Sequence, residues 1–73
     1  MNSQDLKNLR EDLKGELLAI NDYQEHVDVT QDERIKKVME HIRDDEKEHV
    51  AELTKLIREL DEIQKEKFEK EEL

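Results

Sequence analysis

The segment LKNLREDLKGELLAINDYQEHV, residues 6–27, has apolar side chains at steps of three and four residues. That spacing puts them on one face of an α-helix, and we predict a helix from about residue 4 to 28, capped by Asn2 or Ser3. Glu16 stands where an apolar residue is expected, and burying a carboxylate is costly unless it is paired or binds metal. The stripe consists of Leu6, Leu9, Leu13, Glu16, Ile20, Tyr23 and Val27, with Leu17 beside it.

A second segment with the same period, IKKVMEHIRDDEKEHVAELTKLIRELDEI at residues 35–63, predicts another helix, from about 31 to 60 or beyond. Between the two, residues 30–33 have the Ser/Thr-x-x-Glu form of a capping box, which leaves only a short turn. Two helices joined in this way pack antiparallel. We therefore predict an all-α fold, a single domain over residues 1–73, whose second helix extends past the first. The second stripe consists of Ile35, Val38, Ile42, Glu46, His49, Leu53, Leu56, Leu60 and Ile63.

The composition limits what such a hairpin can do alone. With 73 residues, 33% of them hydrophobic, and no Cys, the chain has little interior and no disulfide, so metal binding and self-association are its remaining means of stabilisation. The net charge of -9 repels nucleic acids and anionic membrane surfaces and favours cations as ligands. No segment has the apolar length of a signal peptide or a transmembrane span, so a cytoplasmic location, or one inside another assembly, is expected.

The tail at residues 61–73 is mostly Glu and Lys. Three outcomes remain open for it: fraying, a short third helix, or packing on a neighbour. The apolar residues Leu60, Ile63 and Phe68 need cover that a dimer does not supply. A larger ring-like or closed homo-oligomer is therefore expected.

The candidate chemistry lies in Glu46-x-x-His49, in the stripe of the second helix. Because Glu is frequent in this chain, this pair alone is weak support, and its place on an apolar stripe is what raises its value. Glu16 lies 13 residues before Val29, in the turn, and Glu46 lies 17 after it, so a hairpin brings the carboxylates within about one helical turn of each other.

Three ligands make half of a dinuclear metal site. A two-fold related homodimer would bring four Glu and two His together, and four carboxylate charges would balance two divalent cations. Without metal the carboxylates would repel one another, so metal binding is expected to drive association. Carboxylate-rich ligation with one imidazole per ion suits iron or manganese, and zinc is also compatible.

Glu16, Tyr23 seven residues later, and Glu46-x-x-His49 thirty residues after Glu16 together resemble the ferritin-like superfamily, in which a Glu-x6-Tyr helix precedes a Glu-x-x-His helix. With one such hairpin, the chain resembles a half-ferritin and is most similar to the encapsulated-ferritin family. The resemblance implies a four-helix arrangement of two hairpins around a di-iron ferroxidase centre. Glu16, Glu46 and His49 would be its catalytic metal ligands, and Tyr23 would lie near it. It further implies oxidation of Fe(II) to Fe(III) for iron storage or detoxification, with an encapsulin-type shell, a protein nanocompartment, as partner.

Two stretches depart from that family's pattern. Gly15, Leu17 and Leu18 surround Glu16 where members often carry outer acidic residues, and residues 66–73 differ from the Gly- and Leu-containing peptide that docks members in a shell. Two other functions remain open: a structural zinc, manganese or calcium site without turnover, and a plain helical adaptor with an incidental polar layer. Glu46 and His49 also fit a solvated break in a coiled-coil seam, where a polar residue fixes register.

Four further residues allow simpler interpretations. Tyr23 also fits a core aromatic with its hydroxyl at the rim. His26 is interpreted as a surface or interface histidine and His41 as solvated. Gly15 either permits close backbone approach or a bulge beside Glu16, or has no role.

Overall fold

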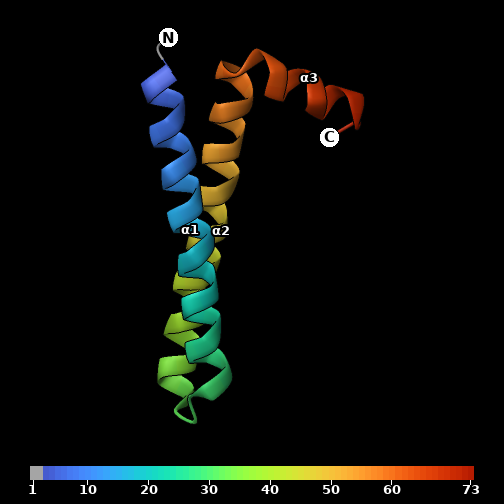
Figure 1. Ribbon diagram of the computed structural model, residues 1–73. Helices are drawn as coiled ribbons and strands as arrows, with labels where there is room; N and C mark the ends of the chain where they lie inside the picture. Colours follow the sequence, from blue (N-terminus) through green and yellow to red (C-terminus); the bar gives the residue numbers. More distant parts are fainter. Residues whose placement is uncertain (1–2) are drawn as a thin grey trace.

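The protein is an α-helical hairpin with a short third helix. A computed structural model describes residues 3–73, with α1 at Ser3–Val29, α2 at Glu33–Leu60 and α3 at Glu62–Lys70 (Figure 1). α1 and α2 lie side by side and antiparallel, and α3 turns away beyond the end of α2. The all-α hairpin predicted from the two stripes is confirmed, and of the three outcomes for the tail the short helix is observed. Ser3 already belongs to α1, and the other proposed cap, Asn2, lies outside the described residues.

The turn between α1 and α2 is capped two residues later than the capping box predicts. Asp32 is the N-cap of α2, and its side chain accepts hydrogen bonds from the backbone N–H groups of Arg34, at 2.8 Å, and Ile35, at 3.4 Å. The Oγ1 of Thr30 instead accepts from the backbone N–H of Asp32, at 3.2 Å. The Arg34 guanidinium also donates to Asp32 and holds the pKa of that carboxyl below its usual value. A charged carboxylate is a good N-cap because it also meets the positive end of the helix dipole.

Asp61 separates α2 from α3. It ends α2 at about the height where α1 begins (Figure 1). Its extended backbone, at φ -108 and ψ 103, breaks the helix, and its side chain caps α3 by accepting from the N–H groups of Ile63 and Gln64, both at 3.1 Å. The same carboxylate pairs with the Arg10 guanidinium of α1 at 2.8 Å. The predicted overhang of the second helix is therefore wrong: α1 has 27 residues and α2 has 28, because Asp61 redirects the chain.

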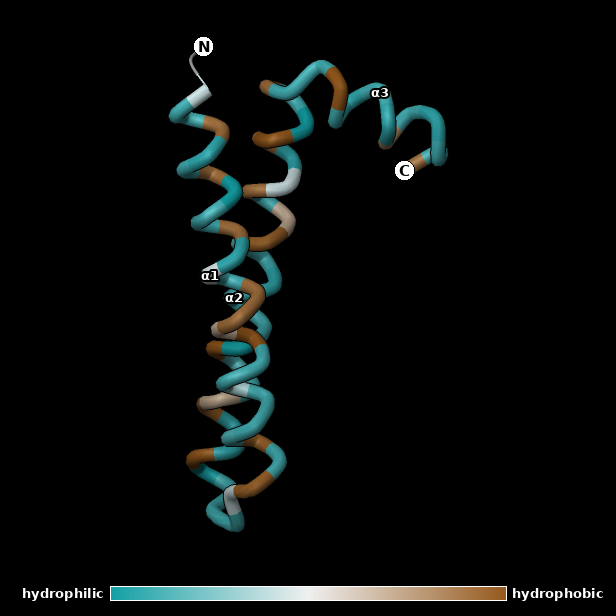
Figure 2. Tube along the Cα trace, viewed as in Figure 1, coloured by the Kyte–Doolittle hydropathy of each residue, from teal (hydrophilic) through white to brown (hydrophobic). Residues whose placement is uncertain are grey.

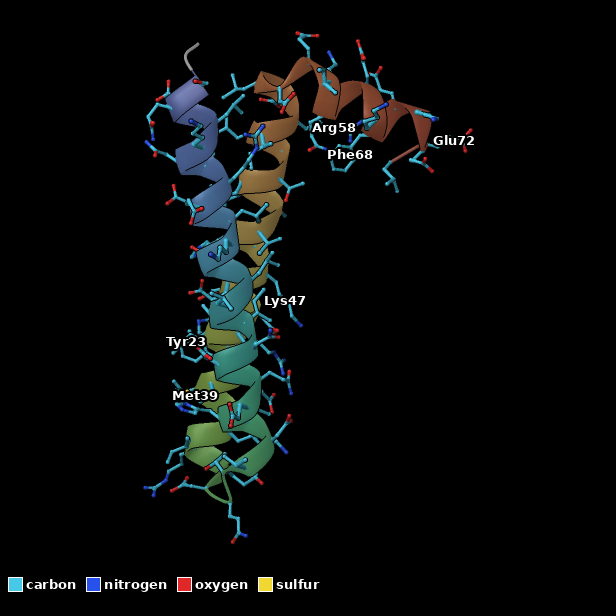
Figure 3. The ribbon with its side chains drawn as sticks, viewed as in Figure 1. Tyr23, Met39, Lys47, Arg58, Phe68 and Glu72 are labelled. Atoms are coloured by element: carbon cyan, nitrogen blue, oxygen red, sulfur yellow. The ribbon has the colours of Figure 1, made fainter. Side chains whose placement is uncertain are left out.

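The third helix is folded against the end of α2 through one aromatic contact. The Arg58 guanidinium lies 4.9 Å from the ring centroid of Phe68, a cation–π arrangement that leaves the ring half-buried (Figure 3). Leu60 and Ile63 remain exposed. The chain thus covers one of the three apolar residues that needed cover and leaves two for a neighbour.

The apolar stripe predicted for the second helix does not face the first helix squarely. Ile57 is 5% exposed and, with Val27, is the only buried hydrophobic residue among residues 3–73, yet Ile57 lies beside the predicted stripe. The packed face of α2 includes Ile42, Glu46 and Leu53 of that stripe, which are half-buried, but is centred on its Ile57 side. Five apolar members of the predicted stripe are exposed: Ile35, Val38, Leu56, Leu60 and Ile63. Periodicity identifies an apolar face but does not say which neighbour covers it.

The hairpin has very little interior of its own. Its radius of gyration is 15.4 Å, against about 11 Å for a compact domain of this length, and its smallest extent is 14 Å. Its accessible surface is 5830 Å², about 1,000 Å² more than a compact monomer of this mass has. Hydrophobic segments recur along both long helices among the hydrophilic ones (Figure 2). None of the helices within residues 3–73 is both long enough and apolar enough to cross a membrane.

Candidate metal centre

The hairpin brings together the three side chains that the sequence singles out as ligands. Glu16 comes from the middle of α1, and Glu46 and His49 lie one turn apart on α2. The Nδ1 atom of His49 is 3.3 Å from Oε2 of Glu16 and 3.6 Å from Oε2 of Glu46. One donor atom from each residue lies within 4.8 Å of the others, which suits three side chains that share one or two ions.

The exposures of these side chains show which direction the site faces. Those of Glu46 and Glu16 are 19% and 26% exposed, so both carboxylates are sheltered in the seam between α1 and α2. The side chain of His49 is 49% exposed, because it belongs to the stripe of α2 that α1 leaves uncovered. Two carboxylates and an imidazole are a suitable donor set for iron, manganese or zinc, but three donors do not complete a six-coordinate shell. The open side of the site is the side on which His49 lies.

The donors line a hollow of about 600 Å³. The residues next to Glu16 in the sequence are not acidic, but other acidic residues surround it in space. Glu11, Asp12 and Glu52 also line the hollow. Sequence reasoning looked for extra acids immediately next to Glu16 and missed these three. The signal was helical spacing, because Asp12 precedes Glu16 by four residues and Glu52 follows His49 by three. The hollow is lined by Glu11, Asp12, Gly15, Glu16, Ala19, Glu46, His49, Glu52 and Leu53.

Gly15 lies on the wall of this hollow without any close neighbour. A Cβ built there would meet nothing within 4 Å, and the helix around it is regular. The close backbone approach and the bulge that the sequence suggested are therefore absent from the hairpin.

Tyr23 and the other two histidines lie apart from the three converging donors. Tyr23 lines a second hollow along α1, and its ring meets that of His26 edge to face at a centroid distance of 6.4 Å. His41 is exposed and pairs with Asp45, the Nε2 atom lying 3.3 Å from the carboxylate. The exposed position of His41 agrees with its interpretation as solvated, and a role of Tyr23 in the chemistry stays a prediction.

The fold and the donor set define a class. An antiparallel helix pair with a Glu on one helix and a Glu-x-x-His on the other has the features of a half-ferritin, a ferritin-like hairpin. The chain belongs to the EncFtn-like family, whose family model matches residues 1–72. The resemblance to encapsulated ferritins is thereby confirmed, and it supports an iron-related function of the ferritin-like kind.

Two curated relatives are similar over most of the hairpin. The encapsulin nanocompartment cargo protein EncC of Myxococcus xanthus is 40% identical over 55 residues, which is 75% of this chain and 42% of that protein. A ferritin-like protein of Thermotoga maritima is 44% identical over 46 residues, which is 63% of this chain and 40% of that protein. The chain thus spans about two fifths of the length of the curated relatives that it matches. No solved structure gave a significant match.

Proposed function

We propose that this protein is a ferroxidase whose di-iron site is completed by a second copy of the chain. One observation carries the proposal: Glu16, Glu46 and His49 place three donor atoms within 4.8 Å of one another at a site that is open on one side. A half-filled set of carboxylate and imidazole donors at the surface needs further ligands, and two-fold symmetry would supply the same three again.

The surface around His49 supports a homodimer. The exposed stripe of α2 carries Val38 and Leu56 on either side of His49 along the helix, so apolar side chains flank the donor that faces outward. The excess surface of about 1,000 Å² per chain is comparable to the roughly 800 Å² that each partner buries in an interface of standard size. Packing two such stripes together would form a four-helix bundle around the paired half-sites.

In the proposed dimer, four carboxylates and two imidazoles bind two Fe(II) ions, which are the substrate. The carboxylate charge of four balances two divalent ions, and it stabilises two Fe(III) ions still more, so oxidation of the bound pair is favoured. Each Fe(II) gives up one electron. The two electrons, with two protons from solvent, reduce dioxygen to hydrogen peroxide, or hydrogen peroxide to two waters. Glu11, Asp12 and Glu52 raise the local concentration of cations at the mouth of the site.

The test is anaerobic loading with Fe(II), followed by oxygen, while the near-ultraviolet absorbance of Fe(III) is recorded. We expect Fe(III) to form faster than in buffer, and Glu46→Ala to abolish the acceleration. Glu48→Ala is the matched control, because Glu48 is exposed, lies two residues away and does not line the hollow. Binding of Fe(II), manganese, zinc or calcium without any acceleration would refute the ferroxidase and leave a structural metal site.

The family and the printed name of the Myxococcus relative support a further part of the proposal. We propose that the protein works as cargo inside an encapsulin-type shell in the cytoplasm. Co-expression with such a shell tests this. The chain is expected to co-elute with assembled shells in size-exclusion chromatography, and elution at its own size alone would contradict the packaging proposal without touching the ferroxidase proposal.

A further inference from the structure

A contact between an imidazole and a thioether bridges the hairpin close to its turn. The Nδ1 atom of His26, on α1, lies 3.4 Å from the Sδ atom of Met39, on α2. His26 is exposed and Met39 is half-buried, so the sulfur lies in the seam and the imidazole at its rim. Tyr23 and Met39 lie along the same edge of the hairpin (Figure 3). The contact joins two long helices and is therefore held by the fold, not by a flexible loop.

The spacing of these two atoms is that of two ligands on one ion. An imidazole nitrogen and a thiolate sulfur bound to tetrahedral zinc at about 2.05 and 2.3 Å lie about 3.5 Å apart, and the observed separation of the imidazole nitrogen and the thioether sulfur is similar. A thioether is a soft donor that is selective for Cu(I), and imidazole also suits copper, whereas harder ions such as Fe(II) gain little from the sulfur. Met39 is the only thioether among residues 3–73, and the chain has no Cys, so this is the one soft site that those residues can form.

The surroundings add negative charge beside the pair. His26 lines a hollow of about 560 Å³ together with Asp22, Tyr23 and Glu25, and Met39 lies outside that hollow. Asp22 precedes His26 by four residues, a spacing that puts both side chains on one face of α1, and its carboxylate gives the rim of the seam a favourable charge for a cation. His26 is ten residues from Glu16, about 15 Å along the helix, so a cation here would be separate from the iron site.

We propose that His26 and Met39 form a Cu(I) site whose remaining coordination positions face the exposed rim of the seam. The site requires neither a second copy nor the ferroxidase activity. Because it ties α1 to α2 near the turn, bound Cu(I) also stabilises the hairpin against unfolding, in proportion to the logarithm of its concentration over the dissociation constant.

The test is an anaerobic titration of the full chain with Cu(I) in competition with a chromophoric Cu(I) chelator. One ion per chain is expected. Met39→Leu preserves volume and helix propensity, and is expected to weaken binding by about tenfold or more while the circular dichroism stays unchanged. His26→Gln is expected to weaken it similarly. His41→Gln, at an exposed histidine paired with Asp45, and Glu46→Ala, in the iron site, serve as controls and are expected to bind Cu(I) as the unaltered chain does.

Two outcomes would overturn the proposal. Undiminished Cu(I) affinity in Met39→Leu would mean that the 3.4 Å contact is only an N–H···S hydrogen bond. Loss of Cu(I) binding in Glu46→Ala would assign the ion to the carboxylate site. X-ray absorption of the Cu(I) form adds an independent readout, because the proposal requires a sulfur neighbour that disappears in Met39→Leu.

Discussion

Substitutions at two neighbouring residues of α2 test separately the contacts within one hairpin and the contacts between two hairpins. Ile57 is 5% exposed against α1, whereas Leu56 is 39% exposed on the uncovered stripe. Ile57→Ala removes three buried carbons at about 0.8 kcal/mol each, and the higher helix propensity of Ala returns about 0.4 kcal/mol, so the cost is about 2 kcal/mol. Leu56→Ala costs less, about 1 kcal/mol, because its side chain is only partly removed from water.

The assay is urea unfolding followed by circular dichroism, with a chelator present and at two protein concentrations that reveal any association. Metal-loaded samples are compared by analytical ultracentrifugation. There the order is expected to reverse: Leu56→Ala weakens the dimer about tenfold, a cost of about 1.4 kcal/mol, because its side chain lies in the proposed interface. Equal costs of unfolding for Ile57→Ala and Leu56→Ala would refute the assignment of the two faces, as would an unchanged dimer in Leu56→Ala.

Three further predictions follow from local features. Gly15→Ala is expected to raise the free energy of unfolding by about 0.5 to 1 kcal/mol in urea titrations, because the added Cβ meets nothing within 4 Å and Ala is the better helix former; a decrease would mean that Gly15 is in close contact in solution. The pKa of Asp61 is held below the usual 3.8, chiefly by the N–H of Gln64, so its stabilisation is complete above that value and is lost as pH falls through the lowered pKa. Helicity is therefore expected to fall only below about pH 4, and by less in Asp61→Asn, whose amide still caps α3 but does not titrate; identical acid transitions would contradict this. Glu16→Gln keeps the shape of the side chain but lowers the negative charge of the proposed dimer's site from four to two. Metal analysis is therefore expected to find less than one iron per chain, whereas Glu25→Gln, the control, leaves the iron content unchanged.

The sequence predicts the hairpin and the convergence of the donors because both follow from helical periodicity and the position of the turn. Glu16 and Glu46 were expected at the same height, and the structure brings their carboxylates together with His49. The sequence could not predict which neighbour covers the stripe of α2. Ile57 and Leu56 are adjacent apolar residues of similar size, and they differ in what packs against them. The bend at Asp61 was equally hidden, because it depends on a cap and on a partner, Arg10, at the far end of α1.

The contact between His26 and Met39 could not be predicted from the sequence either. Neither residue belongs to a motif, and each alone is a common surface or seam residue. Only the antiparallel register brings the imidazole of α1 to the thioether of α2. When no motif singles out either residue beforehand, a pair that the register of two helices brings together is found only from the structure.

Native mass spectrometry during anaerobic Fe(II) titration tests the central claim most directly. The half-site account predicts that iron binds only to species with an even number of chains, at one ion per chain, and that a chelator returns them to single chains. Glu48→Ala is expected to behave in the same way and Glu46→Ala to bind no iron. A single chain that holds iron without associating would contradict the account, as would dimers that form equally well in Glu46→Ala.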